Sequence, residues 1–155
     1  MRSHGQHYDF SNYNLDHELY DPTNKEVIGT FKDEFGAECS SPQPLGMEDG
    51  TIQDKRITAS SSYSCCPASE ARLDDNGWAT SSVDANPWIE VDLVQSTVVS
   101  GVITQGDGRG TWYVKRYVVA YQKQPSSDYE HVNRNGDIKV FIGNTDGNTP
   151  VTNLD

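Results

Sequence analysis

Residues 88–93 alternate between apolar and polar side chains. Ile89, Val91 and Leu93 fall on one face of an extended chain, and two carboxylates fall on the other. This period of two is typical of a β-strand with one buried face. β-Branched and aromatic residues enrich three further segments, which also predict strands: residues 98–105, 113–121 and 138–142.

Turn residues separate these predicted strands. Combinations of Asp, Asn and Gly, which favour tight turns, occur at residues 75–77, 106–110, 135–136 and 146–147. The only helix that the pattern suggests is a single turn near Ala68–Leu73. Many short strands with regular turns predict an all-β sandwich or barrel.

Two regions of the chain differ in composition and in hydrophobic periodicity. Residues 1–38 are polar and acidic, with few aliphatic side chains and no clear period, so we expect an acidic leader or linker there. The segment also carries more aromatic side chains than a pure linker would, which leaves open that part of it packs against the domain: Tyr8, Phe10, Tyr13, Tyr20, Phe31 and Phe35. Residues 39–155 carry the strand pattern and are expected to form one domain.

The charge balance narrows the possible partners. The formal net charge is −11, which argues against nucleic acid, because a phosphate-binding protein needs a basic face. It also weakens an electrostatic attraction to anionic lipid. No apolar run approaches the roughly 20 residues that span a bilayer. We find no nucleophile elbow, phosphate loop or metal-ligand spacing of histidines, and therefore expect a protein that is not an enzyme.

Five short sequence pieces follow one another in a characteristic order. They read PLGMEDGTIQDKRITASSSY at residues 44–63, ARLD at 71–74, GW at 77–78, WIEVDL at 88–93 and TQG at 104–106. Together they closely resemble the discoidin family, also called the coagulation factor 5/8 type C domain. The resemblance implies an antiparallel jelly-roll β-sandwich that serves as an extracellular binding module.

The end of the chain departs from this family. The family continues beyond the position of Asp155 with its last strands and a closing cysteine. The resemblance implies that Cys39 would pair with that cysteine. The expected fold is therefore a discoidin-like jelly roll, over residues 39–155, that lacks the family's last strands.

The resemblance also places three ligand-binding loops at one end of the sandwich. We call them the first loop (residues 62–69), the second loop (79–87) and the third loop (106–112). Arg109 could pair with a carboxylate or sulfate, and Trp112 could stack on a sugar ring or lie in the core. The candidate ligand-binding residues are Tyr63, Cys65, Cys66, Thr80, Ser81, Asp84, Asn86, Arg109, Trp112 and Tyr113.

Two features allow more than one interpretation. Cys65 and Cys66 could form a disulfide with each other, bond to partner chains or remain two thiols; a bridge between neighbours closes a strained ring and is rare. Asp74 and Asp75 could help to hold a structural Ca²⁺, as in some carbohydrate-binding relatives, or could cap a turn. We expect no other cofactor.

The function that these observations favour is extracellular or ectodomain recognition without catalysis. Cell-surface or matrix glycans and proteins are the expected partners, because the second and third loops are polar and offer hydroxyls and an aromatic ring. The alternative is peripheral binding to anionic phospholipid such as phosphatidylserine, which needs apolar loop tips and a basic collar.

Overall fold

A computed structural model describes residues 4–9, 25–30, 43–93, 95, 97–108, 112–124 and 127–154. For residues 4–9 and 25–30 only the backbone is described. Cys39 and Arg109, which the sequence analysis singled out, lie outside the described residues.

The larger sheet has five strands in the order β4-β5-β1-β8-β9, and all of its pairs are antiparallel. Its strands are β1 (His4–Asp9), β4 (Ile57–Ala59), β5 (Trp88–Leu93), β8 (Ala120–Tyr121) and β9 (Glu130–His131). β5 is central to the site because its first residue follows the second loop and because β4 beside it leads into the first loop.

The second sheet has four strands in the order β13-β6-β2-β3, again antiparallel. Its strands are β2 (Lys25–Thr30), β3 (Gln43–Pro44), β6 (Val98–Thr104) and β13 (Val151–Leu154). Two smaller antiparallel pairs complete the fold: β7 (Arg116–Val118) with β12 (Val140–Ile142), and β10 (Asn133–Arg134) with β11 (Asp137–Ile138).

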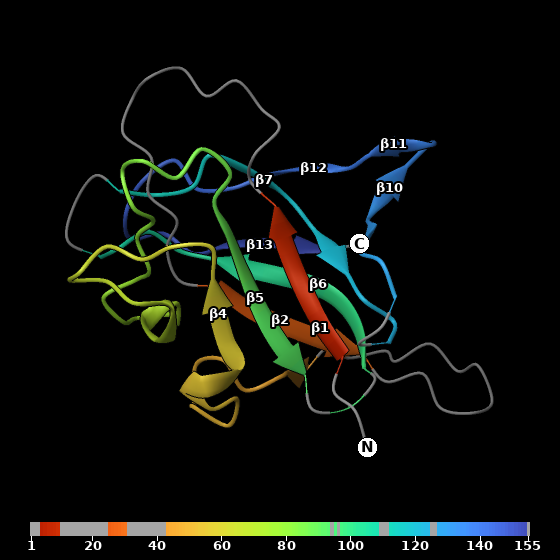
Figure 1. Ribbon diagram of the computed structural model, residues 1–155, viewed down its shortest axis with the longest axis horizontal. Coiled ribbons are helices and arrows are strands. Elements are labelled where there is room, and N and C mark those ends of the chain that lie inside the picture. Colours follow the sequence, from red (N-terminus) through yellow and green to blue (C-terminus); the bar gives the residue numbers. More distant parts are fainter. Residues whose placement is uncertain are drawn as a thin grey trace.

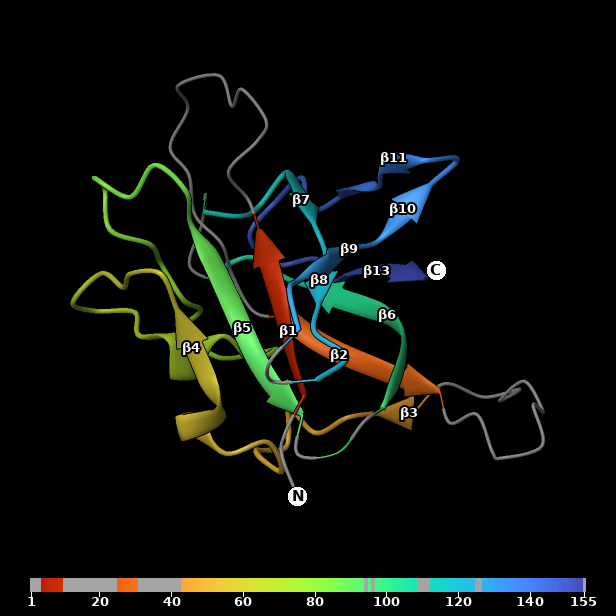
Figure 2. The same ribbon diagram turned by 45° about the vertical axis from the view of Figure 1, so that its right-hand side comes forward.

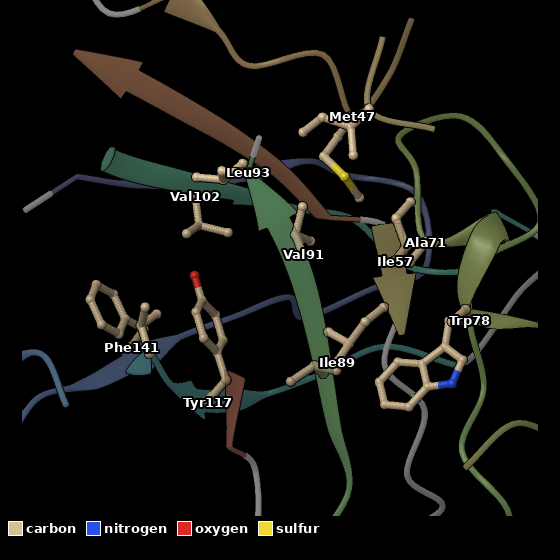
Figure 3. Packing of buried hydrophobic residues seen from close by; sticks show 14 residues of the cluster. Met47, Ile57, Ala71, Trp78, Ile89, Val91, Leu93, Val102, Tyr117 and Phe141 are labelled. Carbon is tan, nitrogen blue, oxygen red and sulfur yellow. The ribbon is translucent and has the colours of Figure 1, made fainter. Parts of the chain in front are cut away.

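The two main sheets face each other as layers of a sandwich, with their strands crossing in both views (Figures 1 and 2). The core between them takes its apolar side chains from both layers, with Ile89, Val91 and Leu93 coming from β5 and Val102 from β6. Figure 3 shows this cluster. The all-β sandwich predicted from the sequence is therefore confirmed.

The observed strands agree with the predicted segments to different degrees. The alternating segment forms β5 with the predicted bounds, and its three aliphatic side chains are buried. The segments 113–121 and 138–142 are each divided into two shorter strands, β7 with β8 and β11 with β12.

The segment set apart as a leader contains strands. β1 pairs with β5 and β8, and β2 pairs with β6 and β3, so these two stretches of residues 1–38 belong to the sheets of the sandwich. The boundary between residues 38 and 39 stays a prediction.

Helical structure in the described part of the chain is limited to two single turns, η1 (Asp54–Arg56) and η2 (Ala68–Glu70). The second lies where the sequence suggested a helical turn. None of the described helices has the length and apolar character that crossing a membrane requires.

Candidate ligand-binding loops

The described residues of the three predicted loops lie on one side of the sandwich. In Figure 1 the first and second loops, drawn in yellow to green, lie at the left, where the described flanks of the third loop also lie. Backbone hydrogen bonds join the first two: Tyr63 N donates to Ala79 O at 2.7 Å, and Ala79 N donates to Cys66 O at 3.2 Å. The first and second loops are therefore neighbours joined by their backbones.

The first loop contains a disulfide between sequence neighbours, Cys65 and Cys66. Of the interpretations left open by the sequence, the structure therefore has the bridge between these two cysteines. Cys65 is exposed, whereas Cys66 is 5% exposed. Tyr63, which forms an isolated β-bridge with Cys66, is 51% exposed.

Asp84 fixes the second loop to the residues that precede the first. Its Oδ2 accepts hydrogen bonds from Ser60 Oγ at 2.6 Å, Ser61 Oγ at 2.5 Å and Thr80 Oγ1 at 3.2 Å. Its Oδ1 accepts from Asn86 N at 3.1 Å. These four hydrogen bonds occupy the Asp84 carboxylate with groups of the protein. Asp84 therefore has a structural role, which is to hold the second loop against Ser60 and Ser61.

The protonation of Asp84 reflects this environment. Partial burial is the largest influence and raises its pKa, but the hydrogen bonds from Ser60, Ser61, Asn86 and Thr80 outweigh burial, so the pKa lies below the ordinary value of 3.8. Because the folded-state pKa is lowered, the stability that Asp84 contributes is present above pH 3.8. It is lost as the pH falls through the folded-state value.

Replacing Asp84 with asparagine should therefore lower the free energy of unfolding at neutral pH by about 1–2 kcal/mol, because an amide nitrogen would face hydroxyl donors. The difference from wild type should shrink as the pH falls below 3.8. Urea denaturation between pH 7 and pH 3 measures both effects. Asp137→Asn, at an exposed position on β11, is the matched control. A gap that stays constant with pH would contradict the proposed role of the Asp84 charge.

The turn between the first and second loops is held by a buried arginine. Arg72 is 8% exposed. Its guanidinium donates to Met47 O, to Ile52 O at 2.8 Å, to Asp54 Oδ1 at 2.6 Å and to Ser69 O at 3.1 Å. A planar group with five donors suits such a set of acceptors. Arg72 thereby ties the segment before β4 to the end of the first loop.

The base of the third loop is fixed in a similar way. Gln105 is buried, and its amide accepts a hydrogen bond from Asp74 N at 2.9 Å and donates to Asp74 Oδ1 at 3.1 Å and Asn148 O at 2.9 Å. Next to it, Gly106 lies so close to Gly147 that a Cβ on Gly106 would come within 2.1 Å of the Gly147 Cα. Only glycine permits this close approach of two backbones.

Two aromatic residues lie at the described end of the third loop. Trp112 is 37% exposed, and its carbonyl accepts a hydrogen bond from Asp107 N at 3.1 Å. Tyr113 is half-buried beside it in the sequence. Trp112 is therefore available to a ligand in part, while Arg109 of the same loop lies outside the described residues.

The polar candidates of the second loop differ in exposure. Asn86 is exposed, whereas Thr80 and Ser81 are half-buried and take part in hydrogen bonds with Ser61. Val83, also on this loop, is the most exposed large hydrophobic residue in the described part of the chain, at 88%. The binding roles of the ten candidate residues stay predictions.

The hypothesis of a calcium site names only two side-chain ligands, Asp74 and Asp75. Asp74 accepts from Gln105, and Asp75 accepts from Asn76 N at 2.7 Å, while Ca²⁺ takes six to eight oxygens. Within the described ranges, no group of three or more His, Cys, Asp or Glu side chains could hold a metal ion. Calcium binding at Asp74 and Asp75 therefore stays a prediction.

Sequence reasoning missed the residues that hold the loops in place. Arg72 and Gln105 were not singled out individually, although both lie in pieces that carry the family resemblance, ARLD and TQG. Ser60 and Ser61 belong to a run of small polar residues that looks like an ordinary loop. The hydrogen-bond partners of these four residues are backbone carbonyls and carboxylates distant in sequence, and such contacts cannot be read from a sequence pattern.

Comparisons with known proteins agree with the fold. The model of the F5/8 type C domain family matches residues 56–154. The chain is 35% identical to coagulation factor VIII of Mus musculus over 144 residues, which are 85% of this chain and 6% of that protein. It is 32% identical to retinoschisin of Mus musculus over 128 residues (76% and 57%), and 37% identical to lactadherin of Sus scrofa over 135 residues (77% and 33%). The chain thus spans less than two thirds of each of these relatives.

Proposed function

Because the chain belongs to the F5/8 type C, or discoidin, domain family, we propose that it is an extracellular recognition module that binds a glycan or protein ligand through its three loops without catalysing a reaction. A binding role in general follows from the family. The loops and the ligand class are the proposal.

The observation that carries this proposal is the exposure of two aromatic residues on loops whose described neighbouring residues are held by hydrogen bonds. Tyr63 and Trp112 are 51% and 37% exposed, on the first and third loops. Aromatic side chains combine a large apolar face with few rotatable bonds, and they bind sugar rings and protein surfaces at low entropic cost. The hydrogen bonds of Asp84, Arg72 and Gln105 hold the surrounding backbone, which lowers the cost of ordering it on binding.

Charge supports a glycan or protein over an anionic membrane. The described surface around the loops carries the exposed carboxylates of Asp74 and Asp75 and the half-buried one of Asp107. Lys115 and Arg116 are exposed cations nearby in the sequence. This mixture does not form the basic collar that attracts anionic headgroups.

One observation favours the alternative of peripheral binding to anionic phospholipid. Val83 is an aliphatic side chain at 88% exposure on the second loop, and an exposed apolar tip could enter the acyl boundary of a bilayer. Co-sedimentation with phosphatidylserine vesicles tests this alternative. Binding that is lost in Val83→Ser and is weakened by salt would establish it over the glycan or protein assignment.

Replacing Trp112 with alanine should abolish the signal on a glycan array, or weaken affinity by roughly 30-fold, which corresponds to about 2 kcal/mol for a central aromatic contact. Ile138→Ala is the matched control, because Ile138 is 40% exposed on β11, which Figure 1 shows at the opposite side of the molecule. Equal affinities of wild type and Trp112→Ala for an array glycan would contradict the assignment. Silence on both the array and the vesicles would direct the search to a protein ligand.

A further inference from the structure

The two cysteine residues of the first loop differ in their exposure to solvent. Cys65 is exposed, while Cys66 is 5% exposed, although they are neighbours joined by a disulfide. Thiol–disulfide exchange proceeds by attack of a thiolate on one of the two sulfurs, and access decides which sulfur is attacked. Attack is therefore expected at the sulfur of Cys65, the exposed residue of the pair.

The backbone around Cys66 is anchored. Cys66 N donates to Tyr63 O at 3.0 Å, and Cys66 O accepts from Ala79 N at 3.2 Å. Cys65 lies in the turn between the two bridged residues Tyr63 and Cys66. A group added to Cys65 would extend from this turn into solvent, whereas a group added to Cys66 would have to displace the packing that buries it.

We propose that Cys65 is a site of covalent modification by an external thiol. The thiolate attacks Sγ of Cys65, a new sulfur–sulfur bond forms there, and the bond to Cys66 breaks. Cys66 leaves as a thiolate and takes up a proton from solvent. The incoming sulfur is oxidised, the Cys66 sulfur is reduced, and no other oxidant is required.

The reverse step restores the loop. Cys66 stays adjacent to Cys65 in the chain, so its thiolate attacks Sγ of Cys65 and expels the added thiol. Because both sulfurs belong to the same chain, this step is intramolecular and needs no second encounter between molecules. The first loop thus carries a reversible attachment point next to the exposed residue Tyr63. This inference concerns the chemistry of the loop and does not rest on the proposed ligand.

The experiment uses the whole chain and reduced glutathione as the thiol, without oxygen. Samples are quenched with acid at successive times, and free thiols are alkylated with N-ethylmaleimide. Peptide sequencing by mass spectrometry under non-reducing conditions then locates each group, and reports Cys39 separately. We expect early samples with glutathione on Cys65 and the alkyl group on Cys66, in at least tenfold excess over the reverse arrangement.

Two controls show that the fold causes this preference. In Cys66→Ser there is no disulfide between positions 65 and 66, so glutathione should leave no adduct on Cys65. In urea, where both sulfurs are accessible, the preference for Cys65 should fall toward parity. Glutathione on Cys66, equal amounts on both cysteines of the folded chain, or no mixed disulfide on Cys65 at any time would overturn the proposal.

Discussion

Replacing Arg72 with methionine is expected to lower the free energy of unfolding by about 3–5 kcal/mol. Methionine has a similar length but no donors. The carbonyls of Met47 and Ile52, two buried residues, would then lose the guanidinium that satisfies them. Each buried polar group left without a partner costs about 1–3 kcal/mol, and a domain has only about 5–15 kcal/mol to lose. Urea denaturation followed by tryptophan fluorescence measures the change.

The matched control is Lys123→Met, which removes another paired cation. Lys123 Nζ lies 2.9 Å from Glu130 Oε2, but both side chains are at least half exposed. An exposed ion pair contributes about 0–1 kcal/mol, so this variant should remain close to wild type. Similar losses in Arg72→Met and Lys123→Met would contradict the structural role of the buried guanidinium.

Replacing Trp78 with alanine should cost about 3–5 kcal/mol as well, for a different reason. Trp78 is 1% exposed and is the largest fully buried side chain among the described residues. It belongs to the same apolar cluster as Ile89, which Figure 3 shows. Its Nε1 also donates to Ser61 O at 2.8 Å. Alanine would leave a cavity beneath the first and second loops and an unsatisfied carbonyl at Ser61. Urea denaturation monitored by circular dichroism measures the loss without relying on the deleted fluorophore.

Trp112→Ala is the counterpart of this variant. This substitution should cost less stability than Trp78→Ala, because Trp112 is partly exposed and Trp78 is fully buried, while it should remove ligand binding. Trp78 and Trp112 therefore separate the two roles of tryptophan in this domain. The distinction fails if Trp112→Ala destabilises the protein as much as Trp78→Ala does.

The sequence predicts a strand well when the signal is local, and poorly when the strand depends on residues far away along the chain. β5 was predicted with its bounds and its buried face, because alternation along a strand is a local signal. β1 and β2 were not predicted. They lie in a polar segment, and their place in the sheets is set by pairing with β5 and β6, which follow far along the chain. Non-local pairing leaves little trace in the pattern of a single strand.

The candidate site shows the same division. The loops were located from family-like pieces of sequence, and the structure brings the first two together through hydrogen bonds between Tyr63 and Ala79. The anchoring of Asp84 to the residues that precede the first loop could not be predicted, since two of its four donors, Ser61 and Ser60, are 23 and 24 residues away in sequence. Likewise, adjacency of Cys65 and Cys66 did not reveal their bond, because neighbouring cysteines are compatible with several states.

The most direct test of loop-mediated recognition is hydrogen–deuterium exchange of the chain with and without the glycan that gives the strongest array signal. If the three loops bind it, amides in residues 62–69, 79–87 and 106–112 should exchange more slowly in its presence, while residues 133–138 of the β10–β11 pair should be unchanged. Slower exchange confined to residues 133–138, with all three loops unaffected, would contradict recognition at this end of the sandwich.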